Sequence, residues 1–341
     1  MLRTATVCFA LSALPAVAAP SVVADIAPVQ ALVARVMAGV GDAPTAIVPP
    51  GADPHALALK PSQARALQNA DVVFWIGEEL SPWLEGPLET LAGNAVHVAL
   101  LDAEATVKLE PREGLGGHDH DEHGEEHADE GHEDHDQGEE HAEDKHDDHD
   151  HGEEHAEDKH DDHGDEHAGH DHHDHDGLDP HAWLSPENGA IWLGLIADVL
   201  SDADPDNADA YRANADAGIA EIEATEAEIA TLLTGLADVP YGVTHDAFQY
   251  FEARFDLAPV AAISGIDAVA PGPARVAAVQ DAMQDAGVSC LFEEAAEVDP
   301  LSATVLEGTD AKVIALDQFG DGSSYVGMLK GLAMGYASCV E

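Results

Sequence analysis

Histidines and acids fill one continuous tract of the chain, from His118 to His175. Neutral imidazole is a nitrogen ligand that suits zinc, copper, nickel and iron, and neighbouring carboxylates add attraction for cations. Apolar residues are nearly absent, so we expect a loop over 117–177 that is disordered without metal. Its candidate auxiliary ligands are His118, His120, His123, His127, His132, His135, His141, His146, His149, His151, His155, His160, His163, His167, His170, His172, His173 and His175.

Three further histidines lie in turns between expected strands and helices. His55 stands in PPGADPHALALKPSQ, His181 in DPHAWLSPE and His245 in YGVTHDAFQYF. Ligands of α/β proteins bind at the loops that follow the strands, so these three positions predict one shared metal site. His97 differs, because it stands within the apolar run AVHVALL, and we expect it to be a structural histidine.

Asp317 is a fourth candidate ligand, at the end of the last expected strand in KVIALDQFGDG. A carboxylate at this point would complete a His₃Asp set, which suits tetrahedral zinc. The alternative is that Asp317 caps the turn that follows it, in which case water takes the fourth position.

The elements that must position these residues alternate between strands and helices on both sides of the tract. Runs such as DVVFWIG and VSCLFEEA predict buried strands, and stretches such as KPSQARALQNA predict helices. A long helical stretch, with Ile219, Ile222 and Ile229 on one stripe, separates the two alternating regions. The sequence therefore predicts two α/β lobes, each with a parallel sheet, joined by a helix.

The first residues, MLRTATVCFALSALPAVAA, are typical of a secretory signal peptide, and we expect cleavage after Ala18. A membrane anchor is the alternative, but the apolar stretch is too short to span a bilayer. The expected organisation is a signal peptide at 1–18, an amino-terminal lobe with the tract at 19–184, helices at 185–237 and a carboxy-terminal lobe at 238–341.

Charge and cysteine content narrow the function further. The chain has 68 acidic against 13 basic residues and a net charge of −55, so it offers no basic surface for nucleic acid. Of its 3 cysteines, Cys8 lies in the expected signal peptide. Cys290 and Cys339 remain as an even pair for an oxidising compartment, which predicts a disulfide; two free buried thiols are the alternative.

A family resemblance rests on several of these segments together. GADPHALALKPSQARALQNADVVFWIGEELSPWLE, DPHAWLSPE, THDAFQYFEARFDL, CLFEE and IALDQFG resemble the ZnuA-type solute-binding proteins, the periplasmic receptors of zinc ABC transporters. The resemblance implies two (βα)₄-like lobes, a long rigid helix between them and metal in the interlobe cleft. It also implies that His55, His181 and His245 are the metal histidines, that Asp317 is an acidic ligand of some relatives, and that Cys290 and Cys339 form a disulfide.

The function that this resemblance implies is capture of Zn²⁺ in the periplasm and its delivery to a membrane permease. We expect a monomer that is not an enzyme, with periplasmic zinc chaperones as further partners and the tract as an auxiliary zinc collector or sensor. One alternative is a manganese or iron receptor, although those relatives carry a carboxylate at the position of His245. Others are a zinc store or chaperone, and a hydrolase with Glu293 or Glu294 as base, although no HExxH motif, nucleophile elbow or P-loop is present.

Overall fold

The computed structural model describes residues 19–112, 114–115, 177–294 and 300–340, which belong to one compact unit. The expected signal peptide and all the tract histidines lie outside the described residues. Within the described residues, no helix combines the length and the apolar character needed to cross a membrane.

The amino-terminal lobe is built on a parallel sheet with the strand order β2-β1-β3-β4. The central strands β1 and β3 are fully buried, whereas the edge strand β4 is partly exposed. His97 lies in this edge strand. The strands are β1 (Val22–Ala24), β2 (Thr45–Ala46), β3 (Val72–Trp75) and β4 (Val96–Ala99). The helices are α1 (Ala27–Val36), α2 (Pro61–Gln68) and α3 (Glu85–Leu91), the last preceded by a 3₁₀ turn at Pro82–Leu84.

The carboxy-terminal lobe repeats this arrangement, because its parallel sheet has the order β6-β5-β7-β8. The strands are β5 (Tyr241–His245), β6 (Ala261–Ser264), β7 (Cys290–Glu293) and β8 (Lys312–Ala315). The helices are α6 (Gln249–Arg254), α7 (Pro273–Ala286), α8 (Pro300–Val305) and α9 (Tyr325–Ala337), followed by a 3₁₀ turn at Ser338–Val340. Parallel strands joined by helices place the carboxyl ends of all strands at one edge of each sheet, where ligands bind.

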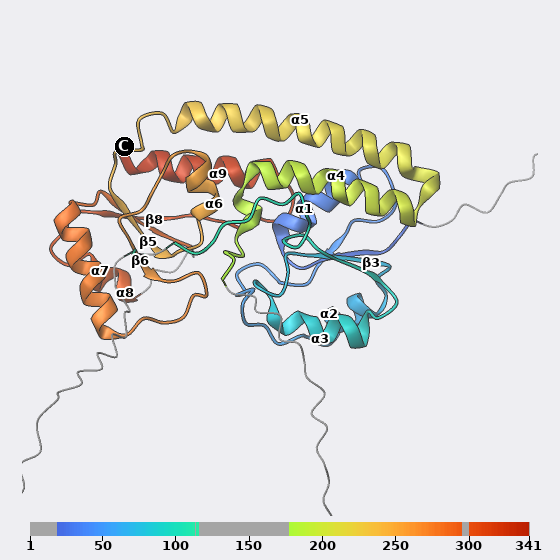
Figure 1. Ribbon diagram of the computed structural model, residues 1–341, viewed down its shortest axis with the longest axis horizontal. Coiled ribbons are helices and arrows are strands. Elements are labelled where there is room, and N and C mark those ends of the chain that lie inside the picture. The colour runs from blue at the N-terminus through green and yellow to red at the C-terminus, as the bar shows by residue number, and fades with distance from the viewer. Residues whose placement is uncertain (1–18, 113, 116–176, 295–299, 341) are drawn as a thin grey trace, which may run out of the picture. The chain divides into compact units, whose positions relative to one another are not determined.

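Two helices and two 3₁₀ turns join the lobes: a turn at Ala182–Leu184, α4 (Pro186–Ala203), a turn at Pro205–Asn207 and α5 (Ala208–Leu232). Ser185 caps α4, since its hydroxyl accepts a hydrogen bond from the backbone N–H of Asn188. Helix α5 packs along α4 and α1 and also against α9 of the other lobe (Figure 1). The fold is therefore the two-lobed α/β arrangement that the sequence predicts.

A disulfide joins Cys290, the first residue of β7, to Cys339 in the terminal 3₁₀ turn. This confirms the predicted pairing. In the chain-entropy model, closing a loop with a sequence separation of 49 stabilises the folded state by about 4 kcal/mol. The bond fastens the end of the chain to the strand that leads toward Glu293 and Glu294.

Candidate metal centre

Two Asp-Pro-His turns carry two of the predicted ligands. The Oδ1 atom of Asp53 accepts a hydrogen bond of 2.8 Å from the backbone N–H of His55. Asp179 does the same for His181, at 3.0 Å. An aspartate that bonds the backbone two residues on forms a tight turn, and the intervening proline fixes the backbone between them. The local sequence thus builds two ligand-bearing turns of the same kind.

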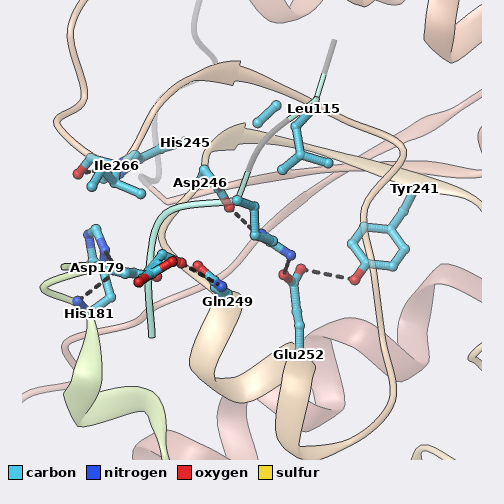
Figure 2. Close-up of polar contacts among 12 residues, drawn as sticks. Leu115, Asp179, His181, Tyr241, His245, Asp246, Gln249, Glu252 and Ile266 are labelled. Carbon is cyan, nitrogen blue, oxygen red and sulfur yellow. Dashed lines mark hydrogen bonds and ion pairs between the residues drawn. The ribbon is translucent and has the colours of Figure 1, made fainter. Parts of the chain in front are cut away.

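The third predicted ligand, His245, is the last residue of β5 and is buried. Its Nδ1 atom lies 2.8 Å from Oε1 of Glu294, which directly follows the neighbouring strand β7. Its Nε2 atom lies 3.2 Å from the carbonyl oxygen of Ile266, so a metal ion at Nε2 replaces that contact. Figure 2 shows the rings of His245 and His181 close to one another.

The fold brings the three histidines together. One nitrogen of each of His55, His181 and His245 lies within 4.8 Å of the other two, and among the described residues this is the one group of metal-ligand side chains placed to share an ion. The ring centroids are 5.6 Å apart for His55 and His181, 5.8 Å for His55 and His245, and 5.0 Å for His181 and His245.

Two of these rings present a buried nitrogen that is not satisfied by the protein. The Nε2 atoms of His55 and His181 are both buried and have no hydrogen-bond partner in the described part of the chain. Leaving a buried polar atom unpaired costs about 1–3 kcal/mol, so a group that satisfies both atoms would stabilise the arrangement. A metal ion between the rings would do so, and the set of three imidazole nitrogens fits one.

Electrostatics keep two of the rings in the form that binds metal. Burial, together with repulsion from His245 and His55, holds the pKa of His181 well below its ordinary value. Burial and His245 also lower the pKa of His55. His245 is the exception: burial would lower its pKa, but the hydrogen bond to Glu294 raises it above the ordinary value. Metal competes with protons for these lone pairs, so neutral rings favour the ion.

The carboxylates of Asp179 and Glu294 contact the buried rings of His181 and His245. The sequence alone does not predict that they orient these rings. Oδ1 of Asp179 lies 2.7 Å from Nδ1 of His181, and Glu294 bonds His245 in the same way. A carboxylate on the second nitrogen orients a metal-ligating histidine and makes it more basic. Burial raises the pKa of Asp179 to about 7, and the charge of Arg112 opposes this rise. The Asp-Pro-His pattern could indicate this role for Asp179, whereas the sequence suggests Glu294 only as the base of the alternative hydrolase.

Asp317 lies outside the three-histidine group, although it lines the same cavity. Its Oδ1 atom accepts hydrogen bonds from the backbone N–H groups of Phe319 and Gly320, at 3.1 and 2.8 Å. It therefore caps its own turn, which was the alternative at this position. His97 also lies outside the group, and its Nε2 atom contacts the carbonyl oxygen of Ala92.

The cavity above the histidines has a volume of about 630 Å³ and is lined from both lobes. The loop after β2 supplies residues 48–55, and the end of β8 with the loop after it supplies residues 315–320. A ligand cavity between two parallel α/β lobes, with histidines from separate segments at one side, defines the class of two-lobed solute-binding proteins.

Comparison with known proteins specifies the family. The model described as "ZnuA: Zinc-uptake complex component A periplasmic" matches residues 22–339. The high-affinity zinc uptake system protein ZnuA of Paracoccus denitrificans is 42% identical over 96% of this chain and 94% of its own length. ZnuA of Brucella suis is 39% identical over 94% and 91%. The chain belongs to the ZnuA family, which consists of transport proteins rather than enzymes, as expected from the sequence.

Solved structures agree on the fold. A crystal structure of ZnuA superposes with a TM-score of 0.69 at 21% identity, covering 94% of this chain and 98% of that one. A zinc-bound ZnuA deletion mutant superposes with a TM-score of 0.68, also at 21% identity, over 94% and 97%.

Proposed function

We propose that this protein captures Zn²⁺ between His55, His181 and His245 and delivers it to the permease of a zinc ABC transporter. The main support is that the imidazoles of His55, His181 and His245 lie together and that, within the described residues, the buried Nε2 atoms of His55 and His181 have no hydrogen-bond partner. Membership of a zinc-uptake family supports the same ion.

The donor set favours zinc over manganese. Three neutral nitrogens suit tetrahedral zinc, whereas manganese and calcium prefer oxygen ligands and higher coordination numbers. Copper binds such ligands more tightly still, so selectivity against it depends on geometry and on the metal available. For the fourth position we propose water rather than Asp317, because Asp317 does not join the group of the three histidines and its Oδ1 atom caps its own turn.

We place the mature protein in the periplasm, after removal of residues 1–18, and we propose that it acts as a monomer. The family name supports the location and the link to an uptake complex. The tract at 117–177 serves as an auxiliary collector in this proposal, since many weak sites beside a tight one raise the local zinc concentration. Zinc chaperones of the periplasm are further proposed partners.

A triple change of His55, His181 and His245 to Ala tests the assignment against the alternative of a zinc store. We expect the triple variant to lose the tight zinc site and to keep the weak ones. Deletion of 117–177 is the matched control, and we expect it to keep one tight site and lose several weak ones. Calorimetric titration, with a zinc chelator as competitor, separates the two classes of site. The opposite pattern would identify the tract as the principal site and refute the proposal.

A further inference from the structure

Arg112 crosses from the amino-terminal lobe to two acids of the other lobe. Its Nη1 atom donates a 2.7 Å hydrogen bond to Oε2 of Glu252 in α6. Its Nη2 atom donates to Oδ1 of Asp246, which is the residue directly after His245. In Figure 2 both carboxylates, labelled Asp246 and Glu252, point toward the same guanidinium group.

The acids that Arg112 contacts are deeply buried. Glu252 is 0% exposed and Asp246 is 4% exposed. The hydroxyls of Tyr241 and Tyr336 each donate a 2.9 Å hydrogen bond to the other oxygen of Glu252. A buried carboxylate without its cation is strongly unfavourable, and the planar guanidinium suits two acids at once better than an ammonium does. The pairing therefore fixes Arg112 firmly against α6 and the end of β5.

The segment that carries Arg112 is also bonded to the turn of His181. The backbone N–H of Asp179 donates a 2.9 Å hydrogen bond to the carbonyl oxygen of Leu109. The hydroxyl of Tyr250, also in α6, donates to the carbonyl of Asp179 and accepts from the N–H of Leu109. Asp179 in turn bonds both the backbone and the ring of His181. Residues 109–112 thus bridge the carboxylate behind one ligand and the residue beside another.

We propose that Arg112 is a positioning residue of the metal centre, which sets the place of His245 relative to His181 through Asp246 and the 109–112 segment. This inference rests on the proposed binding of zinc by the three histidines. Arg112 touches no ligand atom itself. Groups that orient metal ligands typically change affinity by about 10–100-fold, because small errors in ligand placement weaken every bond to the ion.

Arg112→Met tests the inference, since it keeps most of the apolar stem and removes the charge. We expect zinc affinity, measured by chelator competition, to fall by about 10–100-fold. Arg112→Lys keeps the charge without the planar fork, and we expect it to restore part of the loss. Visible absorption of the Co²⁺-loaded protein reports the coordination geometry, and we expect the methionine variant to change it. A purely structural arginine would lower the unfolding midpoint and leave this absorption unchanged.

Arg254→Met is the matched control. Arg254 is on the same helix and pairs with Glu226 of α5, away from the site. We expect this variant to bind zinc and Co²⁺ as the unchanged protein does. If Arg112→Met does not fold, Asp246→Asn removes the charge at one contact and keeps an acceptor oxygen, and we expect a smaller loss of affinity with the same change in Co²⁺ absorption.

A folded Arg112→Met or Asp246→Asn protein with unchanged zinc affinity and Co²⁺ absorption would overturn the inference. The triple histidine variant separates this failure from that of the proposed function. If that variant loses the tight site while Arg112→Met keeps it, only the role of Arg112 is refuted. If the triple variant keeps the tight site, both proposals fall.

Discussion

The two Asp-Pro-His turns are alike in sequence and differ in what surrounds them. Both aspartates accept a hydrogen bond from the backbone of the histidine. Asp53 is exposed, and no bond from it to the ring of His55 is present. Asp179 is fully buried, and its carboxylate bonds the ring of His181 as well as the backbone. The same tripeptide builds the same turn, but of the two aspartates only Asp179, which is buried and whose backbone bonds Leu109 and Tyr250, also contacts the ring of its histidine.

Because of this difference, the rings of His181 and His55 are held to different degrees. His181 is fully buried, and its Nδ1 atom is held, so its Nε2 atom is aimed before any ion arrives. His55 is only partly buried and lies on a loop that lines the cavity. We infer that His181 is the preorganised ligand and that His55 is the adaptable one, which completes the site from the amino-terminal lobe.

The largest expected effect comes from removing the preorganised ligand. We expect His181→Ala to weaken zinc binding by more than about 100-fold, beyond the range for residues that only orient a ligand. We expect a smaller loss for His55→Ala, because water can reach the more open position and act as a ligand. Chelator competition measures both affinities. Equal losses for the two variants would contradict the distinction between the turns.

The next effect tests the aspartates themselves. Oδ1 of Asp179 contacts both the backbone N–H and the ring Nδ1 of His181, so Asn at position 179 keeps this acceptor but removes the negative charge that makes the ring a more basic ligand. We expect Asp179→Asn to weaken zinc binding by about 10–100-fold. Asp53→Asn is the control, since Asn still accepts the backbone hydrogen bond, and we expect a loss of less than about tenfold. A larger effect at Asp53 would reverse the comparison.

Another buried aspartate, Asp25, shows that a perturbed pKa alone does not mark the site. Burial raises the pKa of Asp25 to about 7, as for Asp179, but its two oxygens accept hydrogen bonds from the backbone N–H groups of Ile26 and Ile76. The folded state therefore holds this proton more tightly than the unfolded state, whose pKa is near 3.8. Stability from this group is full below about pH 4 and is lost as the pH rises toward 7.

Asp25→Asn removes that dependence. We expect the free energy of unfolding of the unchanged protein to fall, relative to the variant, by about 3–4 kcal/mol between pH 4 and pH 7. Denaturant unfolding across this range measures the difference between the two profiles, in which contributions shared by both proteins cancel. We expect zinc affinity to stay unchanged. Parallel profiles would show that Asp25 does not titrate in this window.

The sequence alone determined what is local. Alternating apolar runs specify buried strands and helices, and Ser185 and Pro186 specify the start of α4, because hydrogen bonds and burial over a few residues decide these features. The Asp-Pro-His turns are local in the same sense. The sequence predicts the three histidines as ligands because His55 and His181 stand in turns and His245 stands at the end of a strand, where α/β proteins bind ligands.

Only the tertiary structure decided which side chains meet. In the folded protein Glu294 contacts His245, and Arg112 pairs with Asp246 and Glu252. The Oδ1 atom of Asp317 accepts hydrogen bonds from its own loop. Glu294 and His245 are brought together by the pairing of two strands within one lobe, and Arg112 meets Asp246 and Glu252 through the packing of the two lobes, so no local sequence pattern specifies these contacts. The residue types predict a metal site, and the packing of the lobes selects the side chains that hold its ligands in place.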